Sequence, residues 1–561
     1  MKFCDAITDA AALRPSALAA LGDGWRELLN GESFNHEAYA NALVCVLQEY
    51  LPRGTVTIRG ISPVTSLLCE QLTALPYQVE IDPLDNPTNR RHFCGVPLQR
   101  GGAGDAVLEG FIYDDCKLAP ANVFSIRSAK VQKAYALFLY QHRCRLAGRL
   151  NQLLTGDNPM VIFVAKNAYY NQLRMSASLR KRGVHTVAVT FNPDLRDHKS
   201  GYFDDILTTD LLSFLLWLQT AQGAVLHTQG WLFRYHIPVL IDAFLPDNCR
   251  QFVELMDINS FFLPTDTLPK LLPYMRQTWG EEVAELQRVQ LACEQYLVIH
   301  ADGIIYQGSS RIVDLFGGLS QRNRWLQFLC YPLPEFCVAD RSKRSIPKHA
   351  RLVFAGGVPP LNSKHPAALF GDAQLVDTVK TIVSQGLELD VFNNPLKMAE
   401  EDYLNVYAAH LELAEQYPNY RFLKGELPGR IAQIISNYDF GLIVYDYSDE
   451  LLVGPEHFKT LIPAKLFTYL EAGLPVLVSC RAEATAEFVE RYGCGVAISS
   501  TELRDLPNFL RNLDWDSLRA GVVEARECLS MDKQVQRLID FYRLCEQQRD
   551  TVMANLIGNQ L

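Results

Sequence analysis

The chain has 561 residues, with hydrophobic residues at 48% and charged residues at 21%. This length and composition indicate a globular protein of about three domains. The formal net charge of −10 at pH 7 excludes the overall basic surface that nucleic-acid-binding proteins use, so we expect no nucleic acid partner.

The first 50 residues show the spacing of an amphipathic helix. Ala38, Ala42, Val46 and Leu47 would share one helical face. We predict a helical lead-in over residues 1–50, which either binds a partner or packs against the rest of the chain. Its first 21 residues lack the continuous apolar core of a secretory signal, so we expect the mature chain to start there.

Residues 51–150 open with a β-α-β pattern, in which the strands are GTVTIR and YQVEID. Gly60, Ser62 and Thr65 stand where a dinucleotide-binding fingerprint carries three glycines, and Asp82 stands where that fingerprint carries its ribose-binding acid. We predict a Rossmann-like accessory domain that kept the fold and lost the cofactor. A bound nucleotide is the alternative.

A second α/β series occupies residues 151–335. We expect strands in MVIFVAK, VHTVAVTF, GAVLHTQG, HIPVLIDAF and DGIIYQGSS, in the rhythm of a parallel sheet covered by helices on both faces. A basic, proline-bearing linker follows at 330–350. The rhythm restarts over 350–530 with RLVFAGG, LELDVFNN, NYRFLKGELP, YDFGLIVYDY, LPVLVS and CGVAIS, and a helix over 531–561 closes the chain.

These elements predict an α/β fold class. Two Rossmann-like domains would face each other across a cleft, preceded by the helical segment and the accessory domain. Open parallel sheets place ligands at the carboxyl ends of their strands, so we expect the functional site in that cleft.

Three stretches of the last domain, RLVFAGGVPP, YDFGLIVYDY and IPAKLFTYLEAGLPVLVS, resemble the donor-binding half of GT-B glycosyltransferases. The chain is most similar to the retaining, nucleotide-sugar-dependent enzymes related to bacterial lipopolysaccharide and capsule transferases, over about residues 155–530. The resemblance implies a nucleotide diphosphate-sugar in the C-terminal domain and an acceptor hydroxyl on a glycan, a lipid-linked sugar or a protein. It implies neither a metal ion nor a cofactor besides the donor.

The donor site would use backbone turns and cations. Gly356 and Gly357 follow a buried strand, and the lack of a Cβ lets a diphosphate approach their N–H groups. Pro463 suits the first turn of a helix, where Lys465 adds its charge to the positive helix end. Lys364 is a candidate second cation. By resemblance, the nucleobase lies near Lys424, Gly425, Glu426 and Leu427.

Gly473 and Pro475 would end that helix, in structural roles. The family usually places two glutamates where this chain has Thr460 and Thr468. A threonine hydroxyl can still bind a sugar hydroxyl, but more weakly than a carboxylate. The departure leaves two alternatives open, a catalytically decayed GT-B-shaped binding or scaffold subunit and a nucleotide-sugar epimerase.

The acceptor side would come from the 151–335 domain. His227 is expected at a strand end facing the cleft, where the family's histidine contacts the transferred sugar; a structural role is equally open. Candidate acceptor-binding residues are Arg234, His236, Asp257, Asn167, Tyr169 and Tyr170. Asp204 and Asp205 look like a metal-binding pair, but we interpret them as part of a solvated loop.

Fourteen cysteines are scattered without CxxC pairs or Cys/His metal spacing, which favours reduced thiols in the cytoplasm. The most apolar short run, LLSFLLWL at 211–218, is far shorter than the roughly 20 residues that span a bilayer. Peripheral contact with a membrane remains open.

Overall fold

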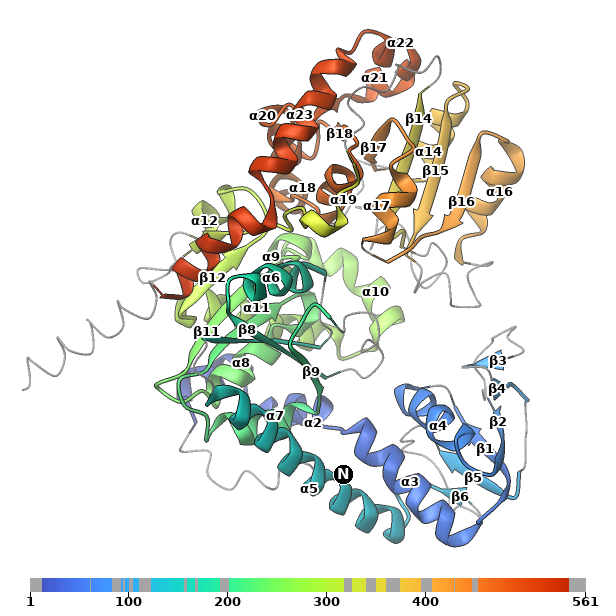
Figure 1. The fold of residues 1–561 in the computed structure, drawn as a ribbon, viewed down its shortest axis with the longest axis vertical. Helices are drawn as coiled ribbons and strands as arrows, with labels where there is room; N and C mark the ends of the chain where they lie inside the picture. The colour runs from blue at the N-terminus through green and yellow to red at the C-terminus, as the bar shows by residue number, and fades with distance from the viewer. Residues whose placement is uncertain are drawn as a thin grey trace, which may run out of the picture.

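The computed structural model describes residues 13–60, 62–82, 92–93, 96–99, 104–109, 123–155, 159–166, 170–191, 201–316, 325–339, 350–359, 374–394, 406–427, 429–445 and 453–543. Within this part of the chain, three parallel sheets follow one another from the N-terminus to the C-terminus (Figure 1). The predicted α/β fold class is confirmed.

The first sheet has the strand order β2-β1-β5-β6, with all neighbours parallel. Its strands are β1 (Gly54–Arg59), β2 (Tyr77–Asp82), β5 (Ala106–Glu109) and β6 (Val123–Phe124), beside the short antiparallel pair β3 (His92–Phe93) and β4 (Val96–Pro97). The helices around it are α3 (His36–Tyr50), α4 (Pro63–Thr73) and α5 (Ala129–Leu154).

The turn from β1 into α4 is closed by side chains. The Ser62 hydroxyl accepts hydrogen bonds from the amides of Val64 and Thr65, and the Thr65 hydroxyl donates to the Gly60 carbonyl. These groups stand where the glycines of a dinucleotide fingerprint would leave room for a pyrophosphate. The arrangement favours the interpretation of a Rossmann-like domain without a cofactor.

The helices of the lead-in region pack on two different domains. Leu21 and Leu29, from α1 (Pro15–Leu21) and α2 (Trp25–Gly31), join the core of the central domain, and Arg14 forms an ion pair with Asp242 at 2.6 Å. Helix α3 instead supplies Leu43 and Leu47 to the accessory core. Residues 13–50 therefore connect these two domains.

The central domain has a seven-stranded parallel sheet in the order β13-β12-β11-β10-β7-β8-β9. The strands are β7 (Met160–Ala165), β8 (His185–Thr190), β9 (Asp205–Thr208), β10 (Val225–Gly230), β11 (Arg250–Leu255), β12 (Gly303–Tyr306) and β13 (Trp325–Gln327). The helices are α6 (Tyr170–Lys181), α7 (Leu211–Leu218), α8 (His236–Ala243), α9 (Asn259–Phe262), α10 (Leu268–Trp279), α11 (Val283–His300) and α12 (Arg311–Phe316).

Two details of this domain differ from the sequence interpretation. The run HIPVLIDAF was predicted as a strand, but it forms helix α8; every residue of α8 is buried, so the run carries no periodicity that would separate helix from strand. The predicted solvated loop holds for the exposed Asp204 and is wrong for Asp205. Asp204 binds Arg180 at 2.8 Å, whereas Asp205 begins β9 and binds Arg149 at 2.6 Å.

The C-terminal domain has the strand order β16-β15-β14-β17-β18-β19, all parallel. Its strands are β14 (Arg351–Gly356), β15 (Glu388–Asn393), β16 (Tyr420–Lys424), β17 (Phe440–Ile443), β18 (Val476–Ser479) and β19 (Gly495–Ile498). The helices are α14 (Val376–Val383), α16 (Ala408–Gln416), α17 (Arg430–Ile435), α18 (Pro455–Thr460), α19 (Ala464–Ala472), α20 (Glu483–Arg491), α21 (Ser500–Arg504), α22 (Leu506–Arg511) and α23 (Trp515–Cys528). The strand order reverses between β14 and β17, which is where open α/β sheets bind ligands.

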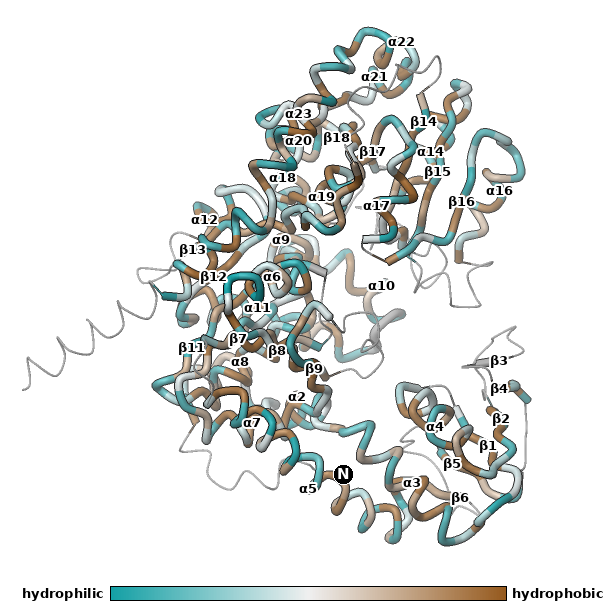
Figure 2. Tube along the Cα trace, viewed as in Figure 1, coloured by the Kyte–Doolittle hydropathy of each residue, from teal (hydrophilic) through white to brown (hydrophobic). Residues whose placement is uncertain are grey.

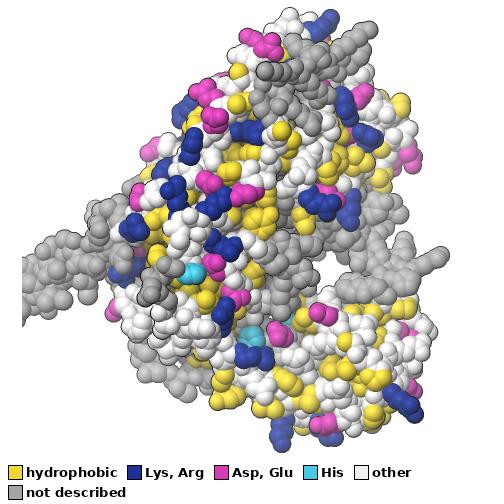
Figure 3. All heavy atoms as spheres, viewed as in Figure 1, with side chains coloured by type: hydrophobic (Ala, Val, Ile, Leu, Met, Phe, Trp, Pro, Cys, Tyr) yellow, Lys and Arg dark blue, Asp and Glu magenta, His cyan; other side chains and the backbone are white. Residues whose placement is uncertain are grey.

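The central and C-terminal domains share one continuous hydrophobic core, and hydrophobic residues follow the inner strands and helix faces (Figure 2). The helical residues 531–543 return from the C-terminal domain to the central one (Figure 1). There, Phe541 and Tyr542 pack on Phe252. On the face drawn in Figure 3, basic and acidic side chains of the described residues are interspersed. None of the described helices combines the length and apolarity needed to cross a bilayer.

Candidate active site in the interdomain cleft

A cavity of about 220 Å³ lies between the central and C-terminal domains. From the central domain, Met256 and Asp257 follow β11, and Gln307 follows β12. From the C-terminal domain, Tyr445 follows β17, and the remaining lining comes from α18 and the start of α19: His457, Thr460, Pro463, Ala464 and Lys465. The carboxyl ends of two parallel sheets therefore meet at this cavity, as the fold predicts.

Lys465 lies at the topological switch point of the C-terminal sheet. Its ammonium is 4.4 Å from the centre of the Phe354 ring and 4.7 Å from that of Tyr445, and it donates a hydrogen bond to the Tyr445 hydroxyl. A Cβ built on Gly356 would lie 3.0 Å from Lys465 Cε. Gly356 and Lys465, predicted separately from the sequence, are thus in contact, and the missing side chain of Gly356 makes room for the lysine.

Lys465 is the second residue of helix α19. Pro463 is the N-cap residue of this helix and has an extended conformation. The first N–H groups of an α-helix lack partners within the helix and give this end a partial positive charge. Gly473 ends the helix in the left-handed conformation, with φ 76°, so its predicted role as the end of this helix is confirmed. The lysine and the helix start together offer a positively charged surface to an anion in the cavity.

Asn393, which sequence reasoning missed, ties the turns of this domain together. Its side-chain oxygen accepts from the Val358 amide at 2.8 Å, and its carbonyl accepts from the Gly425 amide at 2.7 Å. Its amide nitrogen is buried and has no partner among the described residues. The only sequence signal was an amide residue at the end of a strand; Asn393 lies next to Gly356 and Gly425 in space but not in the chain.

The predicted nucleobase region lies at the carboxyl end of the edge strand β16. Lys424 is exposed, and Glu426 lies 3.9 Å from Arg430. A Cβ on Gly425 would lie 2.6 Å from the Asn393 carbonyl, so this turn requires glycine. Leu427 and the other predicted residues of this region do not line the described cavity.

The two threonines that replace the family's glutamates differ in position. Thr460 lines the cavity, but its hydroxyl donates to the Glu456 carbonyl at 2.7 Å, within α18. Thr468 is half-buried on α19, one turn after Lys465, and does not line the cavity. Lys364 lies outside the described residues.

The expectation that His227 faces the cleft is wrong. His227 is the third residue of β10 and fully buried; its Nδ1 lies 2.7 Å from the Tyr542 hydroxyl, and its ring packs on Phe163. The returning helical residues 531–543 cover it. A contact between segments more than 300 residues apart could not be read from the strand pattern around His227.

Asp257 and Arg234 are brought together by Trp231, whose indole N–H donates to Asp257 at 2.6 Å and whose ring lies 4.9 Å from the Arg234 guanidinium.

His236 does not belong to this cluster. It is buried beside Gln290 and 3.8 Å from Glu32. Burial opposes ionisation of Glu32, but hydrogen bonds and charge from His236 and Lys166 outweigh it and lower the pKa of Glu32. Asn167 and Tyr169 lie outside the described residues, and Tyr170 begins α6.

A buried polar network lies behind the cavity wall. Glu254, near the end of β11, is fully buried and accepts hydrogen bonds from the side-chain amides of Asn171, Gln307 and Gln229. Because a carboxylate takes the NH₂ group of Gln307, the carbonyl oxygen of that amide is turned away from Glu254. Gln307 lines the cavity, so this network holds one of the lining side chains in place. Sequence reasoning missed Glu254, Gln307 and Gln229, whereas Asn171 lies in the segment 167–172 that the sequence indicated for the acceptor.

Residues 387–531 match the family model described as "Glucosyltransferase 3-like, C-terminal domain". No curated protein matches the chain. Among solved structures, similar ones include sucrose-phosphate synthase from Thermosynechococcus elongatus (14% identity, TM-score 0.45, covering 71% of this chain and 100% of that one). A second similar structure is a glycosyltransferase from Rickettsia africae, with 7% identity and a TM-score of 0.42, covering 70% of this chain and 99% of that one. A third is AviGT4, a glycosyltransferase involved in avilamycin A biosynthesis, with 13% identity and a TM-score of 0.40, covering 69% of this chain and 98% of that one. The family match includes α19 and Lys465.

Proposed function

We propose that this chain, whose residues 387–531 match the glucosyltransferase 3-like C-terminal domain, is a glycosyltransferase that transfers a sugar from a nucleotide diphosphate-sugar to an acceptor hydroxyl. The observation that carries the proposal is the contact of Lys465 with Gly356 at the switch point, beside the start of α19 and facing the interdomain cavity. A diphosphate is the ligand that a lysine, a glycine turn and a helix start bind together.

The central domain would hold the acceptor across the cavity. Asp257 and Gln307 supply acceptor oxygens on that side, which suit the hydroxyls of a glycan, of a lipid-linked sugar or of a protein side chain. The described cysteines are all free, which fits a reducing compartment, and we place the reaction in the cytoplasm.

In the proposed reaction, the bond between the anomeric carbon and the β-phosphate oxygen breaks as the acceptor oxygen attaches to that carbon. We infer retention of configuration, with the departing diphosphate oxygen taking the acceptor's proton. Lys465 and the start of α19 stabilise the negative charge that develops on the diphosphate. These groups supply the positive charge that the step needs, so we propose that it requires no metal ion.

The test is thermal unfolding of the full chain with a panel of nucleoside diphosphates and nucleotide sugars. At least one should raise the unfolding temperature, and Lys465→Ala should remove most of that rise. Lys459→Ala is the matched control, because Lys459 is a nearby lysine that pairs with Glu456 and does not line the cavity. A wild-type chain that no nucleotide stabilises, or a Lys465→Ala variant that responds like wild type, overturns the proposal.

The second candidate is a GT-B-shaped binding subunit without catalysis. It is favoured by Thr460, whose hydroxyl is taken by the α18 backbone where the family carries a glutamate. Product analysis separates the two. Binding of a nucleotide sugar without transfer to any glycan, lipid-linked or peptide acceptor, and without hydrolysis, would support the binding subunit.

A further inference from the structure

The ladder between β14 and β17 is interrupted at the switch point. Its paired residues are Leu352 with Phe440 and Val353 with Gly441. Continuing this register would place Phe354 opposite Leu442, and the Ala355 amide would then donate to the Leu442 carbonyl.

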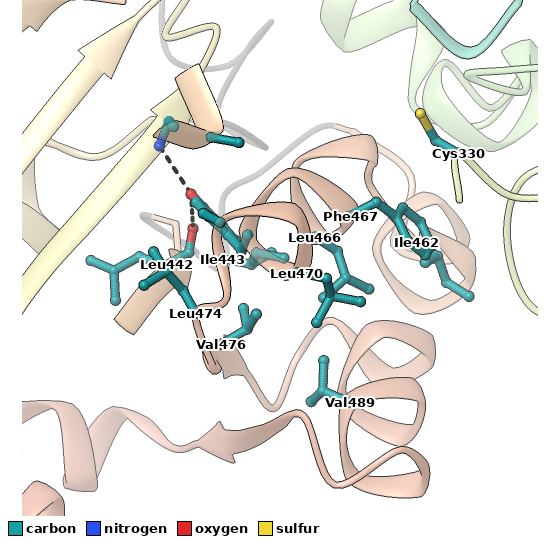
Figure 4. Packing of buried hydrophobic residues seen from close by; sticks show 14 of the residues in the cluster. Cys330, Leu442, Ile443, Ile462, Leu466, Phe467, Leu470, Leu474, Val476 and Val489 are labelled. Atoms are coloured by element: carbon teal, nitrogen blue, oxygen red, sulfur yellow. Dashed lines mark hydrogen bonds between the residues drawn. The ribbon is translucent and has the colours of Figure 1, made fainter. Parts of the chain in front are cut away.

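The Tyr469 hydroxyl takes the place of that ladder hydrogen bond. It accepts from the Ala355 amide at 3.0 Å and donates to the Leu442 carbonyl at 3.0 Å. Figure 4 marks both bonds with dashed lines that meet at the hydroxyl oxygen; the second of them ends at the carbonyl oxygen of Leu442. One buried hydroxyl is thus inserted between two neighbouring strands, and it satisfies both backbone groups that the interruption frees.

The surroundings of Tyr469 are built for its ring. Tyr469 is fully buried, and a Cβ on Gly441 would overlap the ring, so the glycine in β17 makes room for it. Tyr469 lies one helical turn after Lys465 on α19. The residue that separates the strands and the lysine that lies over the resulting gap therefore project from the same side of one helix.

We propose that Tyr469 is a positioning residue, which holds β14 and β17 apart so that the Gly356 turn and Lys465 meet the donor diphosphate. The inference rests on the proposed function. Without the hydroxyl, the Ala355 amide and the Leu442 carbonyl can pair directly. The strands then close, and Gly356 moves relative to Lys465.

The test is Tyr469→Phe in the full chain, which keeps the ring and removes the hydroxyl. The readouts are the Kd of the nucleoside diphosphate that stabilises wild type best, measured by calorimetry, and KM and kcat for the matching nucleotide sugar. We expect the Kd and the donor KM to rise at least tenfold, and the KM for the acceptor to stay within twofold.

Tyr420→Phe is the matched control, because Tyr420 is also buried in this domain and its hydroxyl lies 2.8 Å from His410 Nδ1, on the edge strand β16. Both variants should unfold at lower urea concentration, and only Tyr469→Phe should lose nucleotide affinity. Gly441→Ala provides a second variant with an intact hydroxyl; it should displace the Tyr469 ring and raise the Kd in the same way.

Unchanged Kd values in both Tyr469→Phe and Gly441→Ala, or an equal loss in Tyr420→Phe, overturn the inference and leave the proposed function standing if Lys465→Ala still loses binding. A wild-type chain that binds no nucleotide overturns both.

Discussion

At the scale of single residues, Lys465 is held by a group that a ligand must displace. Its ammonium donates to the Tyr445 hydroxyl, in the place where a diphosphate oxygen would bind. Replacing Tyr445 by Phe keeps the ring under the ammonium and removes this competing bond. With a net hydrogen bond worth about 1 kcal/mol, we expect nucleoside diphosphates to bind roughly fivefold more tightly to Tyr445→Phe, measured by calorimetry. Weaker binding would contradict this and show that the hydroxyl contacts the nucleotide.

Gln307 is expected to contact the acceptor and not the nucleotide. Gln307→Leu removes the amide of a cavity-lining side chain and one donor to Glu254. An unpaired polar group costs about 1–3 kcal/mol, so the acceptor KM should rise roughly 5- to 150-fold while the Kd of the free diphosphate stays unchanged.

Gln251→Leu provides the control for Gln307→Leu. Gln251 is buried in the same sheet, and its amide donates to Thr228 and to the Pro238 carbonyl, away from the cavity. It should lower stability without changing the KM. If Gln307→Leu weakens binding of the free diphosphate as strongly as it raises the acceptor KM, the acceptor contact is excluded.

Some residues of the site could be predicted from the sequence because they belong to local patterns. Others could not, because they meet only through contacts between distant segments. Gly356 and Lys465 belong to local patterns, a strand followed by glycines and a helix start, so their roles could be predicted. Glu254 lies in β11 and Gln307 follows β12, so the two meet only through the lateral order of the sheet. The misplacement of His227 has the same origin, because Tyr542 reaches it from the far end of the chain.

At the scale of elements, α6 of the central domain and α19 of the C-terminal domain are joined by a buried ion pair. Both side chains are almost fully buried; Arg174 donates to Glu471 at 3.0 and 2.8 Å, and Glu471 also accepts from the Leu333 amide. Glu471→Gln leaves the guanidinium buried without its charge partner. We expect a loss of about 3–5 kcal/mol in the free energy of unfolding, measured with urea.

The chain offers a matched surface pair between the same two domains. Arg311 on α12 binds Glu456 on α18 at 2.8 Å, with both side chains partly exposed. Glu456→Gln should cost about 0–1 kcal/mol, because solvent screens exposed pairs. Equal losses in the two variants would contradict the view that burial sets the strength of the α6–α19 contact.

The alternation of strands and helices was predictable along most of the chain, because buried parallel strands read as short apolar runs. Helix α8 was not, since a helix buried on all sides carries the same apolar run. The insertion of the Tyr469 hydroxyl between two strands could not be predicted either. In the sequence, Tyr469 is one more apolar position of an amphipathic helix, and only the register of β14 and β17 gives it a role.

At the scale of the whole molecule, buried ionisable groups set how stability depends on pH. Burial lowers the pKa of His36 and of His410 to about 4. Between pH 4 and 6.5, the unfolded chain therefore holds more protons on these histidines than the folded chain, and stability rises with pH. Burial acts in the opposite direction on Glu294 and raises its pKa to about 7, although the amides of Asn259 and Ser260 donate to it.

Glu294 keeps its proton in the folded chain after the unfolded chain has released its own, so its contribution is present at low pH and is lost as pH rises through about 7. At about 1.4 kcal/mol per pH unit, the loss amounts to roughly 3 kcal/mol. The histidines outweigh this loss up to about pH 6.5, and Glu294 dominates once they have lost their protons in the unfolded chain, so stability in urea should peak between about pH 6.5 and 7. Glu294→Gln imitates the protonated carboxyl and should remove the decline between pH 6.5 and 8. Glu285→Gln, on the same helix but exposed and paired with Arg288, should leave the decline intact, and a decline that persists in Glu294→Gln would assign it to another group.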